Sequence, residues 1–500
     1  MNPAPQSRLH SHFRASDFVL EFFAFLYIFA HSSSTSVHQL LLRISECIYR
    51  GSVLPEDVNS TFPTPATTAD QDRLDRCAAS MANRSTRAEE VPLEDVMLSL
   101  PVIELACSLV ICMVVGGWSD AHGRKLHFVL ALLGALIKDL AALVFVLAKL
   151  PGRDVIYGVT IASGLLGSAN LFAAGALCHV SDNSDYRSRT ARIGGLTFAL
   201  YVGRSASVFV ERTWKPLLVD SFARTTVIVV SVQLVLNLVC LLAVTVVVRE
   251  SMRIMPGYSG SPVRNFVCMR QLKGVVLLAT RKRNTRGREF VLILCAVFLL
   301  ARFVYCGEQG VWAEYLFRRF SWTHQASLML GLQYVCEAVF TLLAACLAQR
   351  LGFQDSSLAI AGAISFMGAS AVKAVALTGG THGIAVIVGA LSPLMAVPVL
   401  ALLSKLVQPE EIGCLFANVA VLSIAAPMLA NVAYWEVFSA TKAKVTEFIY
   451  LLSIFGGTLV CLLLVYIRRN LRIGSLGNLI QEEKVPLLRS FERGFGAAIM

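Results

Sequence analysis

The chain has 500 residues, of which 56% are hydrophobic and only 15% are charged, and its formal net charge is +11. Soluble domains carry about 25% charged residues, so this composition excludes an ordinary soluble protein. Apolar runs of about 20 residues recur from end to end, and a helix of that length crosses the hydrocarbon core of a bilayer. The sequence therefore predicts an all-α polytopic membrane protein.

A basic linker divides the apolar runs into two groups of six, as in transporters built from two six-helix bundles. The expected domains are a tail over 1–17, a bundle over 18–248 with an outer loop at about 43–95, a linker over 249–288, a second bundle over 289–468 and a tail over 469–500. The twelve spans are expected at 18–42, 96–117, 127–148, 155–180, 191–212, 225–248, 289–312, 325–349, 356–378, 383–406, 413–436 and 446–467.

The linker and the outer loop together predict the orientation. The linker is rich in Lys and Arg, with Glu250 its one acid, and such loops face the cytosol. The outer loop has glycosylation acceptor sequences at Asn59 and Asn83, which are used only on the opposite side. Both termini are therefore expected in the cytosol. In the oxidising compartment outside, Cys47 and Cys77 either form a disulfide or remain free thiols.

Motifs for other protein classes are not found in the sequence. There is no phosphate-binding G-x-x-x-x-G-K-[S/T], no G-x-S-x-G elbow, and no C-x-x-C or His/Cys cluster. We therefore expect no enzyme activity, no metal and no cofactor. The basic linker lacks interleaved aromatic residues, so we interpret it as a segment that contacts membrane lipids, and we expect no nucleic-acid partner.

The turn between the second and third spans has the sequence GGWSDAHGRK. It resembles the signature G-x-x-x-D-R-x-G-R-[R/K] of the major facilitator superfamily, with Ala121 where that family usually has arginine. Glycine allows close helix contact and a tight turn, and an aspartate can pair with a cation or with a helix N-terminus. We expect a conformational latch here, and the alternative is an ordinary basic turn. The matching residues are Gly116, Asp120, Gly123, Arg124 and Lys125.

Two further turns, SDNSDYRSRTARIGG and SKLVQPEEIGCLFAN, resemble those of the proton-coupled folate transporters and their thymic stromal cotransporter relatives. The resemblance implies twelve helices, proton-coupled solute transport, and latch roles for Asp182, Arg189 and Glu411. In that group the aspartate pairs with a series of arginines, which here would be Arg187, Arg189 and Arg192. Folate-carrying members have an acid and a histidine where this chain has Thr197 and Tyr305, so folate is not the expected substrate.

Polar residues within the first span predict a wet cavity. The stretch FAHSSSTSVHQ includes His31, Ser33 and Thr35, and so many hydroxyl groups cannot all face lipid. The alternative is helix packing by small residues. Because imidazole titrates near physiological pH, His31 is either a proton carrier or a structural histidine.

Four ionisable residues deep in later spans are further candidates for binding or coupling. Arg204 and Arg302 would suit an organic anion, because the guanidinium group holds carboxylates and phosphates in a bidentate fork. Glu308 and Glu337 are expected either to pair with these arginines or to bind the proton. We interpret the charged residues of the more peripheral spans as ion pairs within one bundle: Glu104, Lys138, Asp139 and Lys373.

The C-terminal tail contains Glu483-x-x-x-Leu487-Leu488, which resembles the acidic dileucine signal bound by clathrin adaptors. The expected location is therefore the plasma membrane or endosomes and lysosomes. The expected function is secondary active transport of an organic anion, coupled to protons, by alternating access. The alternatives are an uncoupled uniporter and a receptor or adhesion protein that does not transport.

Overall fold

The computed structural model describes residues 18–53, 94–148, 153–215, 217, 222–251, 287–322, 324–442 and 445–470, and over these residues the chain forms helices and no strand. The N-terminal bundle comprises α1 (Val19–Val53), α3 (Glu94–His122), α4 (Lys125–Ala148), α5 (Arg153–Leu165), α6 (Ser168–Asp182), α7 (Arg189–Trp214) and α8 (Phe222–Val246). The C-terminal bundle comprises α11 (Gly287–Phe320), α12 (His324–Leu351), α13 (Asp355–Ala374), α14 (Gly379–Val388), η3 (Gly389–Met395), α15 (Val397–Leu406), η4 (Pro409–Glu411), α16 (Ile412–Thr441) and α17 (Phe448–Asn470).

These helices make twelve spans, as the sequence predicts. Eleven segments of the described chain are long and apolar enough to cross a membrane. The twelfth is α1, whose hydropathy is lowered by Glu21, two histidines and a run of hydroxyl side chains. The chain is thus a multi-pass membrane protein, and the observed helices overlap all twelve predicted ranges.

Two of the twelve spans are broken, each for a local reason. The fourth span divides into α5 and α6 at Gly167, whose φ of 93° is a left-handed conformation that favours glycine. The tenth span divides into α14, the 3₁₀ segment η3 and α15, with Pro393 inside η3 and Pro398 in the first turn of α15. The two prolines of the second break can be read in the sequence, whereas no proline marks the first.

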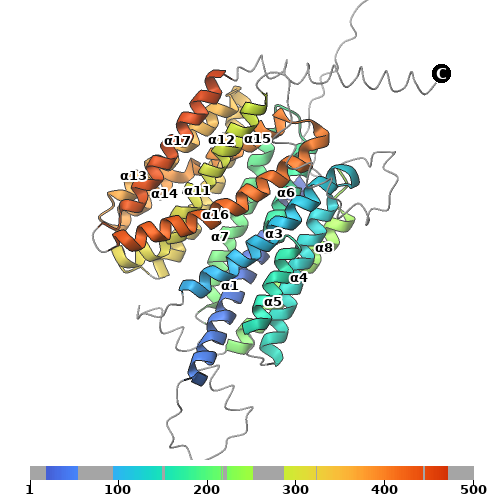
Figure 1. Ribbon diagram of the computed structural model, residues 1–500, viewed down its shortest axis with the longest axis vertical. Coiled ribbons are helices and arrows are strands. Elements are labelled where there is room, and N and C mark those ends of the chain that lie inside the picture. Colours follow the sequence, from blue (N-terminus) through green and yellow to red (C-terminus); the bar gives the residue numbers. More distant parts are fainter. Residues whose placement is uncertain are drawn as a thin grey trace, which may run out of the picture.

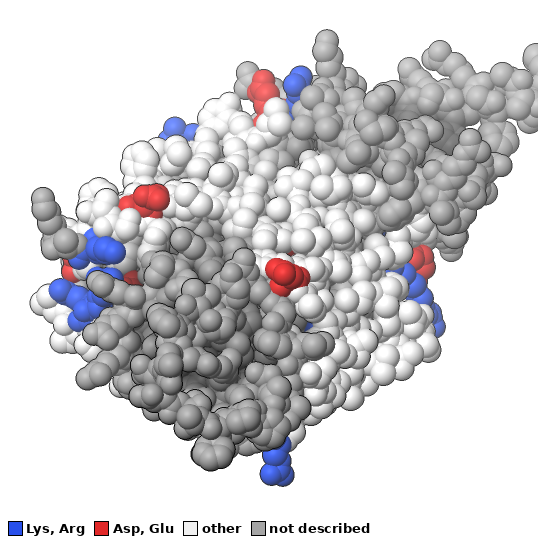
Figure 2. Space-filling model, turned by 60° about the horizontal axis from the view of Figure 1, so that its bottom comes forward, with Lys and Arg blue, Asp and Glu red and all other residues white. Residues whose placement is uncertain are grey.

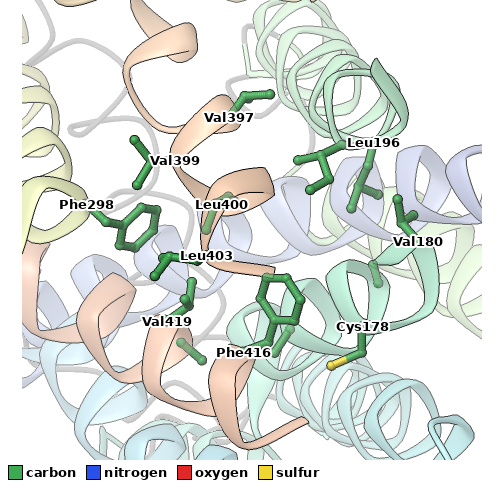
Figure 3. Packing of buried hydrophobic residues seen from close by; sticks show 14 of the residues in the cluster. Cys178, Val180, Leu196, Phe298, Val397, Val399, Leu400, Leu403, Phe416 and Val419 are labelled. Atoms are coloured by element: carbon green, nitrogen blue, oxygen red, sulfur yellow. The ribbon is translucent and has the colours of Figure 1, made fainter. Parts of the chain in front are cut away.

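The two bundles meet along a few pairs of helices (Figure 1), chiefly α7 against α12 and α3 and α6 against α16. We call the end of the molecule that bears Gly123, Asn183 and Gln408 the latch end. Near it, buried apolar side chains of both bundles pack together (Figure 3), among them Cys178 of α6 and Phe416 of α16. We call this cluster of buried apolar side chains the apolar seal.

The outer surface of the bundles suits a lipid environment. Large apolar side chains are exposed along the peripheral helices, for example Leu242 of α8, Leu343 of α12 and Phe455 of α17. Figure 2 shows that charged side chains are sparse on the face it presents. Exposed apolar flanks with few charges are what a bilayer requires of its proteins.

Candidate functional site

A cavity of about 310 Å³ lies between the two bundles, on the far side of the apolar seal from the latch end. The N-terminal bundle supplies most of its wall, through α1, α3, α4, α5, α6 and α7, and the C-terminal bundle contributes α11 and α16. Arg204 and Arg302 both line it, so we call it the arginine cavity. The sequence placed these two arginines on different bundles, and the structure brings them to one site.

Neither arginine has a carboxylate partner among the described residues. The Nε atom of Arg302 is buried and without a hydrogen-bond partner in that part of the chain. Tyr305 follows Arg302 by three residues on α11, so the two side chains share one face of that helix. Arg204 lies near the ring of Tyr201, with its guanidinium carbon 5.9 Å from the ring centre. Two cations without counter-charges therefore face this cavity.

An ion pair forms part of the wall contributed by the N-terminal bundle. Lys138 Nζ of α4 lies 2.9 Å from Glu104 Oε2 of α3, and both residues line the arginine cavity. The expected pairing within one bundle is therefore present, but the pair faces the cavity, because α3 and α4 pack beside it. Asp139 differs from the expectation, since it accepts hydrogen bonds from Ser34 (2.5 Å) and Asn237 (2.7 Å) and has no cation partner among the described residues.

The break in the fourth span adds a helix terminus to the same wall. Ser168, Ala169 and Asn170 begin α6 and line the arginine cavity, and Ser168 Oγ donates to Glu104 at 2.6 Å. Backbone N–H groups in the first turn of a helix lack partners within the helix and favour anions. This helix terminus was not predicted from the sequence, where the glycines of the stretch SGLLGSAN are its only signal.

The polar residues of α1 divide between two environments. His31 and Thr35 line the arginine cavity, and the Thr35 hydroxyl donates to the backbone carbonyl of His31 at 2.9 Å. Ser33 instead faces α8, where its hydroxyl accepts from Gln233 Nε2 at 2.7 Å. The prediction of a wet cavity beside α1 therefore fits one side of the helix, and the alternative of polar helix packing fits the other.

The two candidate glutamates of the C-terminal bundle lie apart from the arginine cavity. Glu308 accepts from Lys373 Nζ at 2.6 Å and from Ser370 Oγ at 2.8 Å. Glu337 accepts from the Tyr305 hydroxyl at 2.7 Å and from Gln333 Nε2 at 2.8 Å. The expected option of pairing with Arg204 or Arg302 is not what the structure has, since both carboxylates point into the C-terminal bundle.

At the latch end, the Asp120 carboxylate joins the two bundles. Its Oδ1 accepts from the backbone N–H of Gly413 at 2.7 Å, and its Oδ2 accepts from that of Cys414 at 2.9 Å, both in the first turn of α16. Arg124 NH1 also lies 2.7 Å from Oδ1. Asp120 thus pairs with a cation and with a helix N-terminus at the same time, the two arrangements that the sequence offered as alternatives.

Close packing of α3 on α16 makes this contact geometrically accessible. A Cβ atom on Gly116 would lie 2.3 Å from the Ala417 Cβ and 2.9 Å from the Gly413 carbonyl oxygen. Gly123, with a φ of 111°, makes the turn into α4. Burial would lower the pKa of Arg124, but the carboxylates of Asp120 and Asp182 beside it hold its pKa above the usual range.

The other latch residues make a second set of contacts. Asp182 Oδ2 lies 3.1 Å from Arg124 Nε. Lys125 Nζ donates to the carbonyl oxygen of Thr245 at 3.1 Å. Arg189 donates across the bundle boundary to the carbonyl oxygen of Ser404 at 3.0 Å, and Glu411 stands at the N-cap position of α16.

Two details of this network differ from the expected pattern. The partner of Asp182 is Arg124 and not the arginines that follow it, because Arg189 binds backbone carbonyls and Arg192 pairs with Glu21 of α1 at 3.2 Å. The sequence also missed Glu250, which accepts from the backbone N–H of Arg124 at 2.6 Å.

Several expected features lie outside the described residues or side chains. These are the glycosylation sites Asn59 and Asn83, the cysteines Cys47 and Cys77, the sorting sequence with Glu483, Leu487 and Leu488, and most of the basic linker.

Known transporters are similar to this chain in sequence. No model of a known protein family matches the sequence. The chain is 24% identical over 448 residues to SLC46A3 of Gallus gallus, a lysosomal proton-coupled steroid conjugate and bile acid symporter. The aligned region covers 86% of this chain and 89% of the relative. The chain is 21% identical over 445 residues to a probable peptidoglycan muropeptide transporter, SLC46, of Drosophila melanogaster, covering 85% and 80%.

Solved structures with the same fold include the human organic anion transporter MFSD10, with a TM-score of 0.59 and 15% identity over 90% of this chain and 99% of that one. The xylose transporter XylE from E. coli, in a partially occluded inward open conformation, has a TM-score of 0.54 and 16% identity over 92% and 98%. At these identities the likeness establishes the fold, two six-helix bundles of the major facilitator type. These proteins are transporters and not enzymes, as expected for this chain.

Proposed function

We propose that this protein, which has the major facilitator fold and resembles the SLC46 solute carriers, is a secondary active transporter that moves an organic anion across a membrane by alternating access. The observation that carries the proposal is the pair of arginines in the cavity between the bundles. Arg204 and Arg302 face that cavity without a carboxylate partner among the described residues. An anionic solute would supply the missing charge.

The charge balance of the cavity favours an anion over a neutral sugar or a cation. The Glu104 carboxylate is already neutralised by Lys138 at 2.9 Å, so the two arginines remain in excess. The first turn of α6, at Ser168, opens onto the same space and adds N–H donors. Discontinuous helices whose N-termini point at an anionic group are a recurrent device of transporter sites.

Alternating access needs a contact that closes one end and can open. At the latch end, Asp120 binds the first turn of α16, Arg189 binds the Ser404 carbonyl, and the apolar seal lies beneath them. The structure therefore corresponds to a state closed at the latch end. Loss of these few contacts would let the bundles rock apart there, while close packing formed at the other end.

Coupling to protons, and a place in endosomes or lysosomes, are finer parts of the same proposal. The Gallus gallus relative is a lysosomal proton-coupled symporter, and its substrates are steroid conjugates and bile acids. With both termini in the cytosol, an acidic lumen would drive anion and proton together toward the cytosol. The dileucine sequence at Leu487 and Leu488 would direct clathrin adaptors to the protein.

Uptake into proteoliposomes tests the proposal. The probe is a radiolabelled sulfated steroid, oestrone sulfate, compared with unconjugated oestrone as a neutral analogue. We expect saturable, counterflow-competent uptake of the sulfate, which Arg302→Ala nearly abolishes at unchanged protein incorporation. An uptake rate that does not change when a proton gradient is applied would identify an uncoupled uniporter. Saturable binding of the probe without counterflow would favour the receptor alternative.

A further inference from the structure

The C-terminal bundle contains a small buried cavity, separate from the arginine cavity. Its volume is about 10 Å³, close to the space that one water molecule needs. Both Glu308 and Glu337 line it, together with Tyr305, Gln333 and Lys373, and no residue lines both cavities. We call it the carboxylate chamber.

The two carboxylates of this chamber differ in what neutralises them. Glu308 has a cation, because Lys373 Nζ lies 2.6 Å from its Oε1. Glu337 has only neutral donors, the Tyr305 hydroxyl at 2.7 Å and the Gln333 amide at 2.8 Å, and no cation partner among the described residues. Its exposed fraction is 1%. A carboxylate buried without a cation is costly to keep charged, so gaining a proton is its least costly adjustment.

We propose that Glu337 takes up and releases the coupled proton, and that Tyr305 links it to the anion site at Arg302. This inference rests on the proposed transport function and names the residue that carries the proton. The carboxylate gains the proton from water at one side of the membrane and returns it to water at the other. No other bond forms or breaks.

Helix α11 connects the two sites. Arg302, Tyr305 and Glu308 follow one another at intervals of three residues along it. Arg302 lines the arginine cavity, whereas Tyr305 and Glu308 line the carboxylate chamber. The Tyr305 hydroxyl binds Glu337 at 2.7 Å, and Tyr305 lies next to Arg302 on the same face of α11. A change of charge at Arg302 therefore alters the electrostatic environment of Tyr305, which is hydrogen-bonded to Glu337.

The sign of this coupling favours symport. An anion bound at Arg302 cancels a positive charge near Glu337 and so makes proton binding there more favourable. By reciprocity, a proton on Glu337 removes a negative charge near the anion and makes anion binding more favourable by the same factor. The loaded state therefore carries both, as a symporter requires.

Other ionisable groups around Glu337 do not replace it in this role. Arg204 of α7 lines the arginine cavity, and the ring of Tyr201 of α7 packs against the ring of Tyr334, with 5.7 Å between the ring centres. Lys373 of α13 is held by Glu308. His382 of α14 accepts from the Trp312 indole N–H, and η3 contributes no ionisable side chain. The remaining neighbours are Tyr334 and Cys336 on α12 itself and Arg302, Tyr305 and Glu308 on α11.

Asp139 provides a matched control. Among the described residues it is the other buried carboxylate whose hydrogen-bond donors are neutral, Ser34 and Asn237, and it lies in the N-terminal bundle. Infrared difference spectra of the full chain in lipid, recorded between about pH 5 and about pH 8, report the carbonyl stretch of protonated carboxyl groups. We expect pH-dependent bands from both carboxyl groups in the wild type, of which Glu337→Gln removes one and Asp139→Asn removes the other. Spectra of Glu337→Gln that keep every pH-dependent band of the wild type would overturn the inference.

Transport of oestrone sulfate supplies the second test. In Glu337→Gln we expect an inward proton gradient to give no stimulation of uptake, while counterflow exchange stays within about twofold of the wild type, since the neutral amide resembles the protonated acid in shape. Stimulation that remains in this variant would contradict the inference but leave the transporter proposal intact. A wild type that moves no anion would defeat the transporter proposal, and the infrared bands would still decide whether Glu337 binds the proton.

Discussion

The Asp120 carboxylate of α3 lies 2.7 Å from the backbone nitrogen of Gly413 in the first turn of α16, so one side chain of the N-terminal bundle caps a helix of the C-terminal bundle. A second carboxylate oxygen binds Cys414 N–H at 2.9 Å. Because the two partners belong to different bundles, the contact must break whenever the bundles separate at the latch end. It therefore stabilises one conformation and not the other.

Replacing Asp120 should change the conformational balance and not the solute site. We expect Asp120→Asn to reduce net uptake several-fold at normal abundance, because charged hydrogen bonds are worth about 1.5–3 kcal/mol. We expect this substitution to change the rate of solute exchange and the rate of net solute uptake to different extents. Asp185→Asn, an exposed acid of the neighbouring turn, is the control and should behave as the wild type. Equal transport by both variants would make the motif a simple basic turn.

Helix contact at Gly116 should be equally sensitive to one added carbon atom. A Cβ there meets Ala417 Cβ at 2.3 Å and Gly413 O at 2.9 Å, so Gly116→Ala must push α3 and α16 apart. We expect a shift toward the state open at the latch end, measured as faster labelling of a cysteine placed at Asn183. Gly158→Ala, where a Cβ meets nothing within 4 Å, should label at the wild-type rate. Faster labelling of both variants would argue against a specific contact.

If an anion binds in the arginine cavity, its affinity should depend on the planar shape of the Arg302 guanidinium group as well as on its positive charge. Arg302→Lys keeps the positive charge but loses the planar fork, so we expect about a tenfold or greater rise in the apparent KM for oestrone sulfate. Unconjugated oestrone lacks the anionic group. Any uptake of this neutral compound, and its competition with oestrone sulfate, should be much less affected by the substitution. If the anionic and neutral compounds respond alike, Arg302 has a structural role.

The predicted orientation can be checked on the outer loop. We expect glycosidase treatment to increase the gel mobility of the wild type expressed in animal cells, and to leave the Asn59→Gln/Asn83→Gln double variant unchanged. Both asparagines are followed by the acceptor pattern that is modified only in the secretory lumen. Detection of this loop from the cytosolic side would reverse the proposed orientation of both termini.

The spans could be predicted from sequence because their signal is local. A bilayer requires about 20 apolar residues per helix, and hydropathy alone finds eleven of the twelve segments. The break at Gly167 could not be found in this way. Its backbone conformation depends on one glycine in a stretch without proline, whereas the tenth span contains Pro393 and Pro398, which lack an N–H and break a helix in a way that the sequence shows.

The residue types in the sequence identified the candidate site residues, but they did not predict the ion-pair and hydrogen-bond partners of those residues. Ionisable residues in apolar spans are rare, so Arg302 and Glu337 could be predicted as candidate functional residues from the sequence. Which cation neutralises which carboxylate depends on how the helices rotate and pack, and no periodic signal fixes that. The structure therefore has ion pairs that the sequence did not predict, between Lys373 and Glu308 and between Arg124 and Asp182. It also has a hydrogen bond from the backbone N–H of Arg124 to Glu250.

Alternating access is the central claim, and the distance between Asn183 and Glu410 tests it most directly. Both side chains are exposed at the latch end, one on each bundle. Spin labels at these two positions, in protein reconstituted in lipid, should give a short distance without solute and a second, longer distance when oestrone sulfate is added at about pH 5. Asp120→Asn should populate the longer distance even without solute. A single short distance under all these conditions would contradict the account.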